Sequence, residues 1–137
     1  MITRRVSQVF LAIMGIAFCK VGIEAMIDPQ AVVSQVGITL DNASALSSMR
    51  AVYGGMHFAF GCLCFWSVLR RPEPALGLIA LYTGGFVAGR ASSILLDGVP
   101  NAFVVTWLAT ETFALLMSVR LLLMIRHREV SASAQPG

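Results

Sequence analysis

Four long apolar segments make up most of the chain, and each ends at proline, glycine or arginine residues. They cover residues 6–27, 47–69, 74–96 and 101–125. A helix needs roughly 20 apolar residues to cross a hydrocarbon core about 30 Å thick, and each segment is that long. The segments are continuously apolar and lack the alternation of membrane-barrel strands. The pattern therefore predicts four transmembrane helices.

The composition supports a membrane protein. Of the 137 residues 57% are hydrophobic and 12% are charged, and the mean hydropathy is +0.78. A soluble domain carries about 25% charged residues, so this chain could not cover a water-exposed surface. Three cysteines cannot all pair, which excludes a disulfide scaffold. We expect an all-α membrane protein with a single four-helix domain at residues 1–128 and a disordered tail at residues 129–137.

Arginines predict the orientation of this bundle. Six of them flank the spans: Arg4, Arg5, Arg70, Arg71, Arg126 and Arg128. The connections at residues 28–46 and 97–100 contain aspartates but no lysine or arginine. By the positive-inside rule, we expect both termini and the loop near residue 70 to be cytoplasmic, in a chain that crosses the membrane several times. We expect no nucleic-acid partner, because no basic stripe with interleaved aromatic residues occurs in an aqueous segment.

Charged residues also lie inside the predicted spans, where each costs about 2.5–3.5 kcal/mol on insertion scales. Arg120 is close enough to the cytoplasmic end to extend its charge out of the membrane. The others, with one histidine and one tyrosine, fall about 20–30 Å from the cytoplasmic arginines at ~1.5 Å per residue, in the exoplasmic half. This candidate site consists of Lys20, Glu24, Arg50, Tyr53, His57, Arg90 and Glu111.

Two interpretations of these charges are open. They can pair to hold the bundle together, Arg90 with Glu111 and Arg50 with Glu24, whereas Lys20 with Glu24 on one helix is the weaker orientation. However, the candidate site contains three cations and only two carboxylates, so one positive charge has no carboxylate to neutralise it. We therefore expect Arg50 or Lys20 to hold an anionic or carbonyl-bearing headgroup.

Small residues at four-residue spacing predict faces where helices approach closely. One face is formed by Ala51, Gly55 and Ala59, and another by Gly85 and Gly89. The same spacing would also serve a homo-oligomer, so the oligomeric state is open.

Cofactor chemistry finds little support in the sequence. Cys62 and Cys64 point about 200° apart on a helix, so their sulfurs cannot meet. His57 alone cannot hold a metal or a haem, so we expect no metal site and no bound cofactor other than a lipid or quinone.

Short motifs in the second, third and fourth spans resemble a known family. These are Arg50-Ala-Val-Tyr53-Gly54-Gly55, Gly89-Arg90, Asp97-Gly98 and Glu111. Together they resemble the small bacterial four-helix membrane proteins catalogued as domain of unknown function 4345, over about residues 5–126. The resemblance implies a four-helix bundle in a bacterial inner membrane, and it brings no activity.

Three functions remain in competition. The interpretation that we favour is a binding protein that holds a lipid, quinone or similar amphiphile at the polar cluster. The second is a membrane enzyme that uses His57 with Glu111 or Glu24 as acid and base. The third is a structural accessory subunit of a larger membrane complex.

Overall fold

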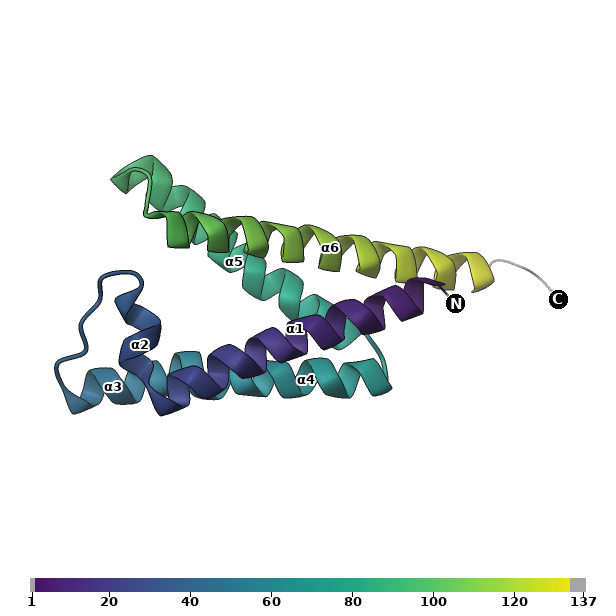
Figure 1. Ribbon diagram of the computed structural model, residues 1–137. Coiled ribbons are helices and arrows are strands. Elements are labelled where there is room, and N and C mark those ends of the chain that lie inside the picture. Colours follow the sequence, from purple (N-terminus) through teal and green to yellow (C-terminus); the bar gives the residue numbers. More distant parts are fainter. Residues whose placement is uncertain (1, 134–137) are drawn as a thin grey trace. The chain divides into compact units, whose positions relative to one another are not determined.

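The computed structural model describes residues 2–133, and the ordered elements within that range are all helices (Figure 1). They are α1 (Ile2–Ile27), α2 (Pro29–Ser34), α3 (Ala43–Met49), the π-helix η1 (Arg50–Met56), α4 (His57–Leu69), α5 (Glu73–Asp97) and α6 (Ala102–Ser133). Because α3, η1 and α4 are continuous, four helices are long and apolar enough to cross a membrane. The predicted all-α, four-helix membrane fold is confirmed.

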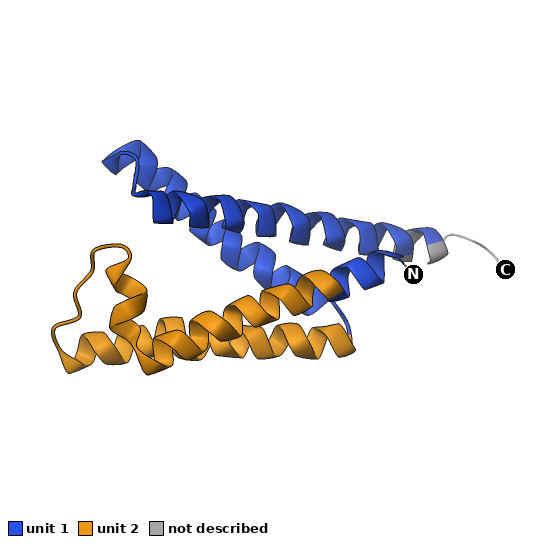
Figure 2. Ribbon diagram, viewed as in Figure 1, with its two compact units in different colours: residues 1–8, 71–137 blue, residues 9–70 orange. Residues whose placement is uncertain are grey.

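The helices belong to two compact units rather than to one (Figure 2). Unit 1 consists of residues 1–8 and 71–137, and unit 2 of residues 9–70. Each unit contains one hairpin of long helices, α5 with α6 in unit 1 and α1 with α3–η1–α4 in unit 2. The single domain predicted from the sequence is therefore built from two helical hairpins.

In unit 2, α1 packs antiparallel against η1 and α4 through four glycines. A Cβ atom added at Gly22 would lie 2.7 Å from the backbone nitrogen of Phe58, and one added at Gly54 would lie 2.6 Å from Sδ of Met26. Gly15 and Gly61 make similarly close approaches to the opposite helix. The glycines are seven positions apart on each helix, so they fall on one face. We call Gly15, Gly22, Gly54 and Gly61 the glycine seam.

The small residues that the sequence assigned to helix packing lie elsewhere. Ala51, Gly55 and Ala59 are exposed, as are Gly85 and Gly89. A Cβ atom at Gly85 or Gly89 would meet nothing within 4 Å. Within unit 2, close approach of α1 to α4 uses the glycine seam instead, and packing through the two predicted faces stays a prediction.

The connection between α1 and α3 is held by side-chain hydrogen bonds. Asp28 caps the short helix α2, and Asn42 caps α3. The Gln30 side chain donates to the carbonyl of Ile38 at 2.9 Å and accepts from the backbone nitrogen of Leu40 at 2.7 Å. These bonds fix the loop next to the end of α1.

Unit 1 turns between α5 and α6 at Gly98, whose φ of +96° is strained for any other residue. Asn101 then accepts a hydrogen bond from the backbone nitrogen of Val104 at 3.0 Å at the start of α6. Helix α6 continues to Ser133, so residues 129–133 of the predicted disordered tail are helical. Residues 134–137 of that tail lie outside the described residues.

Candidate functional site

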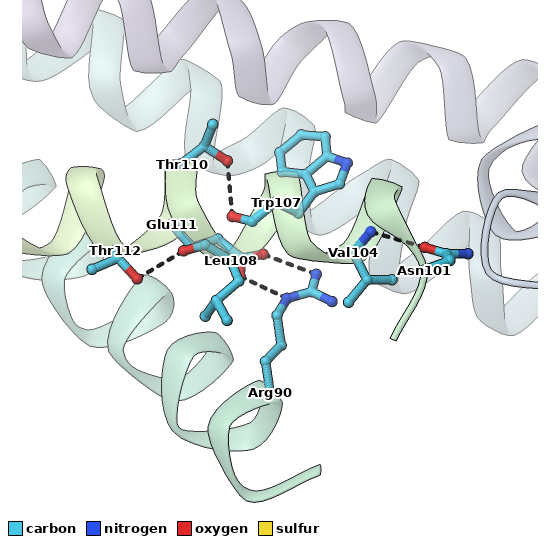
Figure 3. A network of polar contacts seen from close by, with 8 residues as sticks. All are labelled: Arg90, Asn101, Val104, Trp107, Leu108, Thr110, Glu111 and Thr112. Carbon is cyan, nitrogen blue, oxygen red and sulfur yellow. Dashed lines mark hydrogen bonds and ion pairs between the residues drawn. The ribbon is translucent and has the colours of Figure 1, made fainter. Parts of the chain in front are cut away.

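Arg90 of α5 and Glu111 of α6 form the ion pair predicted from the sequence (Figure 3). Nε of Arg90 donates to one carboxylate oxygen at 2.7 Å, and Nη2 donates to the other at 3.0 Å. The Arg90 side chain is 23% exposed and the Glu111 side chain 10%. A two-point contact of this kind is stronger and more directional than a single hydrogen bond. The pair therefore links the two helices of unit 1 at a defined register.

Neighbouring side chains support this pair. The guanidinium carbon of Arg90 lies 5.6 Å from the centre of the Phe86 ring, one helical turn earlier, which is within the range of a cation–π contact. One turn later, Ser93 donates to the carboxylate of Asp97 at 2.9 Å. Arg90 is thus both neutralised by a carboxylate and packed on an aromatic ring.

In unit 2, Glu24 pairs with Lys20 and not with Arg50. Nζ of Lys20 lies 2.6 Å from a Glu24 carboxylate oxygen, one turn apart on α1. The proposed Arg50–Glu24 pair is not formed. Because Met26 packs against Gly54, Arg50 lies one turn beyond that contact, past the end of α1 and away from Glu24. The side chains of Lys20 and Glu24 are 67% and 51% exposed, so the pair lies on the surface of α1.

Arg50 is therefore the surplus cation. Its Nε donates to the carbonyl of Met26 at 3.2 Å, at the C-terminal end of α1. That end carries unsatisfied carbonyls and a partial negative charge, which a cation stabilises. Within unit 2, Arg50 has no carboxylate partner, whereas Lys20 has one there and Arg90 has one in unit 1. Of the three cations, Arg50 is thus the one that neither of the two carboxylates neutralises.

The segment around Arg50 is a π-helix, which the sequence analysis missed. It runs from Arg50 to Met56 and contains Tyr53 and both glycines of the Tyr-Gly-Gly motif. π-helical turns are rare and are found mostly at functional sites. Gly54, which belongs to the glycine seam, is buried against α1. The π-helical turn therefore packs directly on α1.

His57 begins α4 directly after the π-helix and is 8% exposed. Its Nδ1 lies 3.1 Å from the carbonyl oxygen of Val52. The ring stacks on Tyr53 at a centroid distance of 5.5 Å and meets Phe18 edge-on at 5.9 Å. These contacts place Tyr53 and His57 together, one turn from Arg50.

The carboxylates that the enzyme hypothesis assigned to His57 are engaged elsewhere. Glu24 is bound to Lys20 on the surface of α1, and Glu111 gives both oxygens to Arg90 in unit 1. A general acid or base must reach its partner within hydrogen-bond distance or through one water. Within unit 2, the contacts of His57 described above are with aromatic rings and a backbone carbonyl, and the enzyme hypothesis stays a prediction.

The seven predicted site residues fall into two groups. Unit 2 holds Lys20, Glu24, Arg50, Tyr53 and His57, and unit 1 holds Arg90 and Glu111.

The cysteines are all free. Cys62 is exposed and Cys64 is fully buried, as expected for side chains on opposite faces of a helix. Among residues 2–133, no group of three or more histidine, cysteine or acidic side chains is placed to hold a metal ion.

Comparison with known proteins identifies the family. The sequence model of the family described as Domain of unknown function (DUF4345) matches residues 6–122. The match covers most of the chain, and the chain therefore belongs to this family, as the sequence motifs predicted. Neither the curated proteins nor the solved structures contain a match to it.

Proposed function

We propose that this member of the family is a binding protein of a bacterial inner membrane, which holds the headgroup of a lipid, quinone or similar amphiphile at Arg50. The observation that supports the proposal is that no carboxylate of unit 2 pairs with Arg50. A guanidinium has five N–H donors, and the contact with Met26 uses one of them. The remaining donors suit a phosphate, carboxylate or carbonyl oxygen.

The position of Arg50 within its span supports a headgroup as the ligand. Arg50 is the eighth residue of the helix that begins at Ala43, so it lies close to one end of the span. With both termini in the cytoplasm, as we propose from the flanking arginines, that end is exoplasmic. An amphiphile in the outer leaflet would then bring its headgroup to Arg50 and leave its tail in the hydrocarbon.

Tyr53 and His57 would form one wall of this site. Their stacked rings lie one and two turns after Arg50 on the same face, with Phe18 against His57. Aromatic rings of this kind suit the apolar part of an amphiphile next to its polar head. The site as proposed therefore consists of the Arg50 guanidinium and the Tyr53–His57 stack, all in unit 2.

The test is to purify the full chain in a mild detergent and to identify the amphiphile that remains bound by mass spectrometry. We expect a single class of amphiphile to be retained at a fixed ratio to protein, and to be lost from the Arg50→Gln variant. Equal retention by Arg50→Gln would contradict the proposal and leave Arg50 as a cap on α1.

A role as an accessory subunit is the second candidate, and one observation favours it. Lys20 and Glu24 are 67% and 51% exposed although they lie within a predicted span. Ionised side chains in spans usually face a protein interior or a water-filled cavity. A partner subunit over this face would lose its contact in the double variant Lys20→Leu/Glu24→Leu, which a shift in the mass of the detergent-solubilised complex would report.

A further inference from the structure

We propose that unit 1 carries a second site, for the phosphate of an anionic phospholipid. The site is a cavity of about 230 Å³ where the first turns of α1 meet the second half of α6. Both segments belong to unit 1 and share one colour in Figure 2. Four apolar and two polar residues define it here: Ile2, Val6, Met117, Met124, Thr3 and Arg120.

Thr3 supplies a hydroxyl that lacks a partner. The residue is 3% exposed, and its Oγ1 has no hydrogen-bond partner in the described structure. By contrast, the hydroxyl of Ser7, one turn later, has a partner within the helix, because it donates to the carbonyl of Thr3 at 3.0 Å. A buried hydroxyl without a partner costs free energy, which an acceptor bound in the cavity would remove. Thr3 lines the cavity, so its buried hydroxyl is the donor that we expect a ligand bound there to engage.

Arg120 supplies a positive charge in the same wall. Among the side chains of unit 1 that the structure describes, no carboxylate pairs with it, in contrast to Arg90 on α5. It is nine positions after Glu111, or about 14 Å along α6 at 1.5 Å per residue, so it does not belong to the Arg90–Glu111 pair. An arginine and a hydroxyl that line one cavity are donors for two oxygens of a phosphate.

An apolar groove adjoins the cavity along α6. It has a volume of about 420 Å³, is lined by Leu116, Val119, Leu123 and His127, and shares Arg120 and Met124 with the cavity. Arg120 thus lines both the cavity that holds Thr3 and the apolar groove. This is the arrangement that a lipid with a phosphate and an acyl chain requires.

The surrounding charge favours an anionic lipid over a neutral one. Arg4 and Arg5 follow Thr3 on α1, and Arg126 and Arg128 follow Arg120 on α6. Clustered basic residues at the end of a span attract anionic headgroups of the cytoplasmic leaflet. The site is distinct from Arg50, which belongs to unit 2, and it does not depend on the function proposed for Arg50.

The test is a titration of the delipidated full chain with phosphatidylglycerol and, separately, phosphatidylcholine, followed by native mass spectrometry. We expect phosphatidylglycerol to bind more tightly. Loss of a charged hydrogen bond should weaken its binding about tenfold in Arg120→Gln, and loss of the hydroxyl about threefold in Thr3→Val. Arg126→Gln removes the same charge outside the cavity, and Thr106→Val removes a hydroxyl that is bonded within α6. Thr106→Val should bind like the original chain, and Arg126→Gln, which removes one charge of the surrounding cluster, should lose clearly less affinity than Arg120→Gln.

Three results would overturn the proposal. One is equal binding of the two lipids, and another is an equal loss in Arg120→Gln and Arg126→Gln, which would reduce Arg120 to one charge among many. The third is unchanged affinity in Thr3→Val. If Arg120→Gln fails to fold, Thr3→Val together with Arg120→Lys, which keeps the charge but loses the planar donor group, decides the question.

Discussion

Arg90 and Glu111 join α5 to α6 by two hydrogen bonds, at 2.7 and 3.0 Å, and the carboxylate is 10% exposed. Removal of one partner from a buried pair leaves the other charge without compensation, which costs about 3–5 kcal/mol. Glu111→Gln should lower the free energy of unfolding by about that amount. The double variant Glu111→Gln/Arg90→Gln should recover part of the loss, because no unpaired charge remains. Thermal unfolding in detergent measures both.

Glu24→Gln is the matched control for this prediction. It also removes a carboxylate from an ion pair within a span, but the Lys20–Glu24 pair is more than half exposed. An exposed pair contributes roughly 0–1 kcal/mol. If Glu24→Gln destabilises as much as Glu111→Gln, burial does not distinguish the two pairs and the interpretation of Arg90–Glu111 is wrong.

The glycine seam gives a second stability prediction. Alanine at Gly22 or Gly54 places a methyl group against Phe58 or Met26 in unit 2, and overpacking of this kind costs about 1–3 kcal/mol. Alanine at Gly85, where a Cβ atom meets nothing within 4 Å, should be neutral or slightly stabilising. The three variants can be compared by their unfolding temperatures in one detergent. A Gly85→Ala variant that is the least stable of the three would contradict the packing described for unit 2.

The arrangement of arginines predicts the topology. A cysteine placed at Asn101, in a chain whose native cysteines are replaced by serine, should react with a membrane-impermeant thiol reagent only from the exoplasmic side. A cysteine at Arg71 should react only from the cytoplasmic side, and serves as the control. Labelling of position 101 from the cytoplasm would invert the orientation and place Arg50 in the inner leaflet.

The spans and the Arg90–Glu111 ion pair could be predicted from the sequence, because both depend on the lengths of the apolar segments and on the positions of charges within them. Apolar length fixes the helices, and Arg90 and Glu111 are charges at similar depth on adjacent helices joined by a short turn.

The partner of Glu24 could not be predicted, because it depends on the register of two helices. That register is set by the glycine seam, and Gly15 and Gly22 look like ordinary glycines within an apolar run. The π-helix at Arg50–Met56 has the same origin. Nothing in the local sequence specifies its wider turn, and its burial against α1 becomes visible only in three dimensions. These are the features that single out Arg50, so the sequence left Arg50 and Lys20 as equal candidates.

The most direct test of the central claim compares Arg50→Gln with Lys20→Gln in the Arg120→Gln background, which removes the second lipid site. Both variants lose one positive charge near the same end of unit 2, but Lys20 is already neutralised by Glu24. Bound amphiphile per protein is measured by lipid extraction and mass spectrometry. The account predicts that Arg50→Gln loses the bound amphiphile and Lys20→Gln retains it. Equal retention in both variants, or loss in Lys20→Gln alone, would contradict the assignment of Arg50 as the headgroup-binding residue.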